Sequence, residues 1–294
     1  IKFLLKSEGM TVDGVNDEVL FPNATDAEAS GGYLTPTSTG FKLTTTSDRV
    51  NNNSTYVYIA IRRPDGYVGK PPSLGKDVFD IDTWVSDSAD PAMMSNFPVD
   101  FSLDREPTVS SGWESNMNAR GRLIQNKFLI VNGTDAISTG TWGQFDYNNG
   151  WFNRQGYTGY SDWTSWMWKR HKGMDVVNYT GNGVVGHQIP HSLSQSPEMI
   201  WVKNMDRSDW WAVGHKGLNG GTNPWNYQLK LNESGEDAAS AIWNYSEPTS
   251  THFAVGGANT VNYDGENLIA FLFASSNDAD GNPISKVGYY AGSG

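Results

Sequence analysis

The stretch that decides the fold is Asn132-Gly133-Thr134-Asp135-Ala136, which follows the apolar run Phe128-Leu129-Ile130-Val131. The same arrangement, an apolar run followed by Asn-x-Thr or Asn-x-Ser and then Asp-Ala, occurs at residues 23–27 and 232–238. A strongly apolar stretch follows each copy further along the chain, at residues 56–61, 163–168 and 268–273. The chain is therefore a tandem array with a period of roughly 100 residues.

A unit of this length can bury its own hydrophobic core, so we interpret each period as a folded module. We expect residues 1–66 to be the C-terminal part of a first β module, 67–172 a second β-sandwich module and 173–284 a third. Residues 286–294 restate the pattern of 175–183, so residues 285–294 are predicted to start a further repeat, with a strand over 287–294.

Strand signals dominate the composition of the third module. Short apolar runs separated by Gly, Asn, Pro or Asp predict strands over 175–179, 188–191, 198–203, 210–214, 227–231, 253–255 and 267–273. About seven short strands separated by turns are typical of an antiparallel β-sandwich. The sequence therefore predicts an all-β fold of tandem antiparallel sandwich modules, of jelly-roll or lectin-like type, with short capping helices.

The repeated Asn element is interpreted as a turn that ends a strand and starts a short helical cap. Thr25-Asp26-Ala27-Glu28 and Ser234-Gly235-Glu236-Asp237 both fit the hydroxyl-x-x-acid pattern of a capping box. The second copy has Ile137 at the acid position, so a weaker cap is expected there. Proline positions give a second landmark: Pro98 precedes Asn132 by nearly the same distance as Pro197 precedes Asn232.

Composition excludes several classes of function. The net charge of −11 argues against a nucleic-acid partner, which requires clustered Lys and Arg. The chain has no cysteine, which excludes disulfides, thiolate metal sites and cysteine nucleophiles. Its longest apolar run, residues 268–274, is far too short to span a membrane. We therefore predict no cofactor, no nucleic-acid partner and no membrane partner.

Aromatic residues crowd the segment between Trp142 and Trp168. Exposed aromatic rings stack on the apolar faces of sugars, and Trp142, Trp151 and Tyr157 lie in a Gly- and Asn-rich loop where such a role is plausible on chemistry. We name these three as candidate glycan-stacking residues, with packing as the competing interpretation. Trp166 and Trp168 alternate with Ser165 and Met167 and align with Phe271 and Phe273, so that pair is predicted to lie in a core.

Carboxylates and histidines give no strong signal of catalysis or metal binding. Five Asp residues lie close together in one stretch: Asp77, Asp80, Asp82, Asp87 and Asp90. We favour a solvated acidic loop over a calcium site there, because the Gly and the final Glu of an EF-hand loop are missing. No Gly-x-Ser-x-Gly motif or phosphate loop is present. Two carboxylates across a cleft would suffice for a glycosidase, so that chemistry stays an alternative.

Three motifs of the third module carry a resemblance to a known family. They are Asp-Val-Val-Asn-Tyr-Thr-Gly-Asn-Gly at residues 175–183, His191-Ser192-Leu193, and Pro197-Glu198-Met199-Ile200-Trp201-Val202-Lys203. With the strand ending Ile269-Ala270-Phe271-Leu272-Phe273-Ala274, this run resembles an uncharacterised repeat domain of large structural proteins from marine and aquatic tailed phages. The resemblance is good over 173–294, fair over 93–170 and fragmentary over 1–66. The family has no established catalytic or binding residues.

The resemblance implies a non-enzymatic component of the virion, located at the outer surface of the particle as a tail, fibre or capsid-decorating appendage. It also implies partners among other virion proteins and copies of the chain itself, in a homo-oligomer. Engagement of host-surface glycans is a further expectation. Two alternatives stay open: a polysaccharide-degrading tailspike-type enzyme or its carbohydrate-binding module, and a bacterial surface adhesin.

Overall fold

The computed structural model confirms an all-β protein with a few short helices. It describes residues 18–19, 29–30, 33–37, 40–43, 45–47, 50–52, 56, 73–84, 91–112, 115–124, 126–139, 143–152, 162–233, 236–237 and 240–290. Within these ranges no helix is long and apolar enough to cross a membrane. The short helical elements are η1 (Gly75–Asp77), η3 (Arg122–Ile124), η4 (Leu218–Gly221), η5 (Pro224–Asn226), η6 (Ala241–Trp243) and α1 (Asn259–Asn262).

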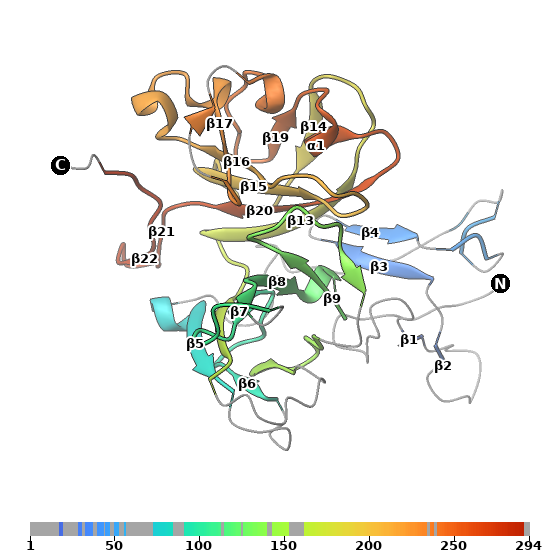
Figure 1. The fold of residues 1–294 in the computed structure, drawn as a ribbon, viewed down its shortest axis with the longest axis vertical. Coiled ribbons are helices and arrows are strands. Elements are labelled where there is room, and N and C mark those ends of the chain that lie inside the picture. Colours follow the sequence, from blue (N-terminus) through green and yellow to red (C-terminus); the bar gives the residue numbers. More distant parts are fainter. Residues whose placement is uncertain are drawn as a thin grey trace.

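Two large antiparallel sheets form the body of the molecule (Figure 1). The first runs in the order β10 (Ser138–Thr139), β9 (Lys127–Ile130), β8 (Asn118–Gly121), β7 (Phe101–Arg105), β12 (Thr164–Trp168) and β5 (Phe79–Thr83). The second runs in the order β18 (Glu236–Asp237), β17 (Gln228–Lys230), β16 (Ala212–His215), β15 (Met199–Asn204), β20 (Asn267–Phe273) and β13 (Met174–Thr180).

Strand order repeats between the two sheets. Each strand of the first sheet has a counterpart eight strands later in the chain, and the six counterparts lie in the same order. A small sheet repeats in the same way: β6 (Met93–Met94) pairs with β11 (Gly150–Trp151), and β14 (His187–Pro190) pairs with β19 (His252–Val255). The second and third modules therefore share one topology, and the seven strands predicted for the third module all form.

The repeated asparagine has the same hydrogen-bond role in both modules. Asn132 Oδ1 accepts from the backbone N–H of Met117 at 3.0 Å, and Asn232 Oδ1 accepts from the N–H of Trp211 at 3.2 Å. Each bond ties the turn after β9 or β17 to the residue ahead of the neighbouring strand. The predicted capping helix is wrong in the third module, because Glu236–Asp237 pairs with β17 as strand β18.

A second repeated contact shows which residues of the two modules correspond. Asp100 accepts from the N–H of Arg170 at 2.7 Å, and Glu198 accepts from the N–H of Ser275 at 2.8 Å. Each acid also forms an ion pair with a cation after the neighbouring strand, Asp100 with Arg122 and Glu198 with Lys216. Asp100 thus corresponds to Glu198, which places the prolines Pro98 and Pro197 one residue out of register and corrects the predicted alignment of the two.

The two large sheets pack face to face around a shared hydrophobic core. Figure 1 shows the second sheet, with β15 and β20, above the green strands β7, β8 and β9 of the first. Phe101 of β7 contacts Phe271 of β20 with ring centroids 4.5 Å apart, and Trp168 stacks on Phe101 at 5.1 Å. Trp211 lies 6.1 Å from Phe271 in the same core. Successive side chains along a strand point to opposite faces of the sheet. The other face of each large sheet therefore packs in an outer core of its own.

Each module completes its sandwich on its outer side. The outer core of the second module lies between the first large sheet and the β6–β11 pair, and it includes Trp151, Trp163 and Met167. The outer core of the third module, beneath β14 and β19, is larger and includes Ile200, Val202, Trp225, Trp243 and Phe253. The prediction that Trp168 packs in a core is confirmed at the face between the modules, and its neighbour on the same face, Trp166, is half-buried.

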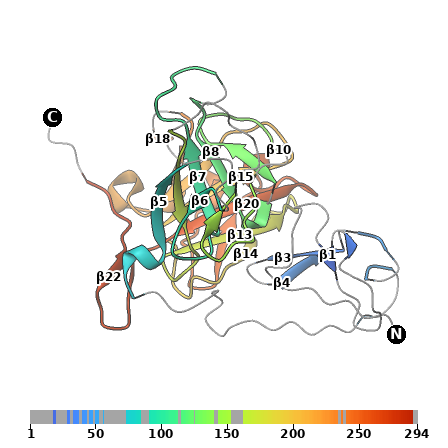
Figure 2. The same ribbon diagram turned by 90° about the horizontal axis from the view of Figure 1, so that it is seen from below.

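Short hairpins lie outside the two modules. N-terminal to them, β1 (Glu18–Val19) pairs with β2 (Ala29–Ser30), and β3 (Leu34–Thr37) pairs with β4 (Gly40–Leu43); Figure 2 shows β3 and β4 in blue, to the right of the large sheets. After β20, β21 (Ser276–Asn277) pairs with β22 (Pro283–Ser285). The strand predicted over 287–294 is not formed at residues 286–290, where Val287 instead donates its N–H to Ser275 Oγ at 3.0 Å, and residues 291–294 lie outside the described ranges.

We expect Asn232→Ala to lower the free energy of unfolding by roughly 1–2 kcal/mol, because the N–H of Trp211 loses its acceptor in a half-buried position. Asn132→Ala removes the matching bond at a more exposed position and is expected to cost less. Urea denaturation of both variants measures the effect, with Asn277→Ala on the exposed face of β21 as control. Equal stability of Asn232→Ala and wild type would show that the repeated asparagine has no structural role.

Candidate functional site

The predicted glycan-stacking residues divide into two groups. Trp142 and Tyr157 lie outside the described residues. Trp151 has no exposed surface, and its ring stacks on Phe145 at 5.2 Å with an interplanar angle of 3°. Its indole N–H donates to Ser165 Oγ at 3.0 Å. A ring buried in this way offers no face to a sugar, so the stacking role expected of Trp151 is corrected to core packing.

We expect Trp151→Ala to lower the free energy of unfolding by roughly 3–5 kcal/mol, as for other large-to-small changes of a buried tryptophan. A thermal melt followed by circular dichroism measures the loss. Tyr290→Ala is the control, because the side chain of Tyr290 is 92% exposed and its removal should change stability by no more than about 0.5 kcal/mol. A Trp151→Ala melt that matches the wild type would contradict the core assignment.

The acidic stretch of the second module serves local structure. Asp77 Oδ2 accepts from the N–H groups of Ser73 and Leu74 at 2.9 and 3.0 Å, and the hydrogen bond from Ser73 is the main cause that lowers the pKa of Asp77. Asp80 lies in β5, and Asp82 Oδ2 accepts from Met94 N–H at 2.7 Å. Asp87 and Asp90 are outside the described ranges. Among the described residues no group of His, Asp or Glu is arranged to hold a metal ion.

The most concentrated polar structure lies where the second and third modules meet. Lys203 of β15 has no exposed surface, and its ammonium donates to three carbonyl oxygens: Thr134 of the second module at 3.0 Å, Asp209 at 2.8 Å and Arg207 at 3.3 Å. Burial lowers the pKa of Lys203 to about 8, opposed by the nearby carboxylates of Asp209 and Asp135. The ammonium thus joins the turn of one module to the hairpin of the next.

Backbone hydrogen bonds continue this junction on both sides of Lys203. Thr134 O also accepts from Asp209 N–H at 2.8 Å, and Met205 O accepts from Ile137 N–H at 2.8 Å. The indole N–H of Trp211 donates to Ile130 O at 2.9 Å. The segment between β9 and β10 is therefore bonded along its length to the loop between β15 and β16.

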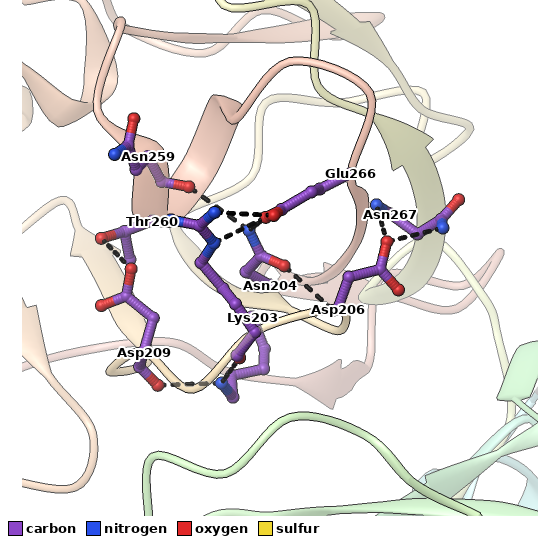
Figure 3. Close-up of polar contacts among 9 residues, drawn as sticks. Lys203, Asn204, Asp206, Asp209, Asn259, Thr260, Glu266 and Asn267 are labelled. Atoms are coloured by element: carbon purple, nitrogen blue, oxygen red, sulfur yellow. Dashed lines mark hydrogen bonds and ion pairs between the residues drawn. The ribbon is translucent and has the colours of Figure 1, made fainter.

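The same loop is fastened to its own module by a charged network (Figure 3). Arg207 donates to both carboxylate oxygens of Glu266, at 2.8 and 2.7 Å, and lies 3.8 Å above the ring of Tyr263. Hydrogen bonding from Arg207 is the main cause that lowers the pKa of Glu266. Asp206 Oδ2 accepts twice from Asn267, and Asp209 accepts from the hydroxyl of Thr260.

The polar groups at this junction hold the two modules together. Three N–H donors exhaust the capacity of an ammonium group, so Lys203 presents neither a proton nor a lone pair to a substrate. The carboxylates of Asp206 and Glu266 are likewise engaged by backbone or side-chain donors. Charged groups that are fully paired in this way hold two surfaces in one arrangement.

A second polar cluster lies on the outer face of the first large sheet. Asp104 is fully buried and accepts from Arg120 Nε at 2.8 Å and from the indole N–H of Trp163 at 3.0 Å. Burial raises the pKa of Asp104, while the guanidinium of Arg120 acts in the opposite direction. Arg120 is itself buried, 4.8 Å from the ring centroid of Phe128. This cluster belongs to the second module alone.

The residues of both clusters were not predicted from the sequence. A signal was present for each: Lys203 follows the apolar run Met199–Val202, and Asp104 and Arg120 lie at buried positions of short strands. A charge at an inward position of a strand must be paired, so it marks an internal contact. The pattern could not predict the partner of Lys203, because Thr134 lies in the other module.

Comparison with known proteins gives one match. Residues 151–294 match the model of DUF7483, a domain of unknown function. The matched segment begins at β11 and contains every strand of the third module. No curated protein and no solved structure matches the chain.

We expect Lys203→Met to lower the free energy of unfolding by roughly 2–4 kcal/mol at neutral pH, because the hydrogen bonds from the buried ammonium to three carbonyl oxygens are lost. Lys286→Met, at an exposed position, is the matched control and should change little. Urea denaturation measures both variants. If Lys203→Met were as stable as Lys286→Met, the ammonium would not be holding the modules together.

Titration of Lys203 gives a separate prediction. The native protein releases this proton near pH 8, whereas the unfolded chain keeps it until about pH 10.4. The unfolded state binds more protons in that window, so this group makes stability rise with pH from 8 to about 10. The difference in unfolding free energy between wild type and Lys203→Met should therefore grow as pH rises. A constant or shrinking difference would contradict the lowered pKa.

Proposed function

We propose that the chain is a non-enzymatic structural component of a phage particle, a tail, fibre or capsid-decorating appendage built from tandem β-sandwich modules. The observation that carries the proposal is the junction: consecutive modules share a hydrophobic core and a buried cation rather than hanging on a flexible linker. A component that keeps its shape at the outside of a particle requires such rigid joints. The resemblance of the repeats to those of phage structural proteins supports the same role.

The arrangement of charged groups also favours a role without catalysis. The charged groups at the junction are bonded to other protein groups, among them Lys203, Arg207 and Glu266. The duplicated topology is a second argument, because a single active site does not account for two copies of one sandwich. The expected partners are other particle proteins and further copies of the chain.

Engagement of host-surface glycans is a second role that we propose for the same particle component. The observation that favours it is the aromatic-rich stretch between Trp142 and Trp168, in which Trp142 and Tyr157 are the remaining candidates for stacking on sugar rings.

Immunogold labelling of particles purified from the source that encodes the chain tests the structural role. We expect gold at one defined position on intact particles, together with recovery of the chain from those particles by mass spectrometry. Absence of the chain from particles, with the chain present in the lysate, would contradict the proposal. Release of oligosaccharides from host-surface polysaccharide by the purified chain would instead favour the enzyme.

A further inference from the structure

Each large sheet carries one row of apolar side chains across the face that is turned toward the other module. Cross-strand pairs define the two rows and show that they correspond position by position. In the first sheet, from β5 to β9, the row is Ile81, Trp166, Leu103, Ala119 and Leu129. In the second sheet, from β13 to β17, the row is Val176, Phe271, Trp201, Val213 and Leu229.

Burial along the two rows runs in opposite directions. In the first sheet Leu129 is 0% exposed at one end, and Ile81 is 51% exposed at the other. In the second sheet the end that corresponds to Ile81 is closed, because Val176 is 2% exposed, whereas Leu229 is half-buried. The two modules therefore meet through different halves of the same face: the β8–β9 half of the second module packs on the β13–β20 half of the third.

A contact between unlike halves leaves one half of each kind unused. The residues of the second module on which the third module packs include Phe101, Ala119 and Leu129. We call their counterparts in the third module, Met199, Val213 and Leu229, its receiving face. The described part of the chain holds two large sheets, so no third large sheet packs on this receiving face.

The residues after the β21–β22 hairpin lie on the third module as β13 lies on the second. Asn178 of β13 donates to Leu123 O, next to Arg122, at 3.1 Å. Tyr289 has the place of Asn178 in the restated sequence, and it packs on Gly217, next to Lys216. An added Cβ at Gly217 would lie 2.4 Å from the Tyr289 side chain, so the glycine admits this ring.

A second contact of this segment also repeats. Asp175, just before Val176, lies 3.9 Å from Arg170, and Val287 donates its N–H to Ser275 Oγ, the residue that corresponds to Arg170. The segment forms no strand at residues 286–290, whereas β13 is a strand because β20 of its own module pairs with it. The counterpart of β20 for this segment would be the last strand of a further module.

We propose that the receiving face of the third module binds a β-sandwich module of the same repeat type, which packs there through the half of its sheet that corresponds to β13 and β20. The proposal names a partner for the structural role put forward above and rests on that role only for the place of assembly. A bound module offers a receiving face of its own. The contact can therefore repeat in one direction and give a polar array.

An extended chain tests the proposal. Gly294 matches Gly183, so a second copy of residues 184–294 joined after Gly294 makes residues 286–294 the first strand of a fourth module. The protein has no cysteine, so Leu229→Cys in the original third module introduces a single thiol. The rate at which this thiol reacts with a maleimide reports how exposed the receiving face is.

We expect the thiol of Leu229→Cys to react about tenfold more slowly, or slower still, in the extended chain, because the added module covers it as the third module covers Leu129. Met199→Cys is a second reporter on the same face and should be protected in the same way. Ile81→Cys is the matched control, because it lies at the open end of the corresponding row in the second module. Its thiol should react equally in both chains.

Equal reactivity of Leu229→Cys and of Met199→Cys in the two chains, whether the added residues fold or stay unfolded by circular dichroism, would overturn the proposal. Slower reaction at Ile81→Cys as well would show general association of the extended chain rather than docking at this face, and would also overturn it. Both measurements use the purified protein, so their failure leaves the gold-labelling result for the particle role unaffected.

Discussion

The rest of the structure depends on the burial of one ammonium group between two repeats. Lys203 lies on the face of β15 that is turned toward the second module, and it has no exposed surface. A charge in that position is tolerated only if its hydrogen bonds are met. One of the three acceptors is Thr134 O, so the third module reaches this arrangement only with the second in place.

The shared core and the buried cation have different physical roles. Apolar contact between the sheets is non-directional and supplies most of the attraction. Directional bonds from Lys203, Trp211 and Ile137 fix the position at which the sheets meet. Apolar faces alone would let two β-sandwich modules pack in many orientations, whereas these hydrogen bonds select one orientation. The pairing is therefore specific as well as stable.

Much of this architecture was predictable from the sequence, because a period-2 pattern and turn residues act locally. All seven strands predicted for the third module formed, and the alignment of Asn132 with Asn232 was confirmed by their identical bonds. The prediction of a capping helix was wrong because Glu236–Asp237 pairs with β17, and pairing between strands outweighs a local capping preference. The role of Trp151 was predicted wrongly because a Gly- and Asn-rich neighbourhood resembles a surface loop, whereas Trp151 lies in strand β11, which pairs with β6, and its ring packs on Phe145 in a core.

The packing of one module on another could not be predicted in the same way. It depends on contacts between residues far apart in the chain, such as Phe101 with Phe271, and no local pattern encodes which faces meet. The central claim is that the two modules form one cooperative unit. Native-state hydrogen exchange tests it most directly, by comparing the amides of Leu129 and Val202 in the cores of the two modules. The account predicts equal opening free energies and an equal response to denaturant for both; exchange of one amide through a separate, lower-energy opening would contradict it.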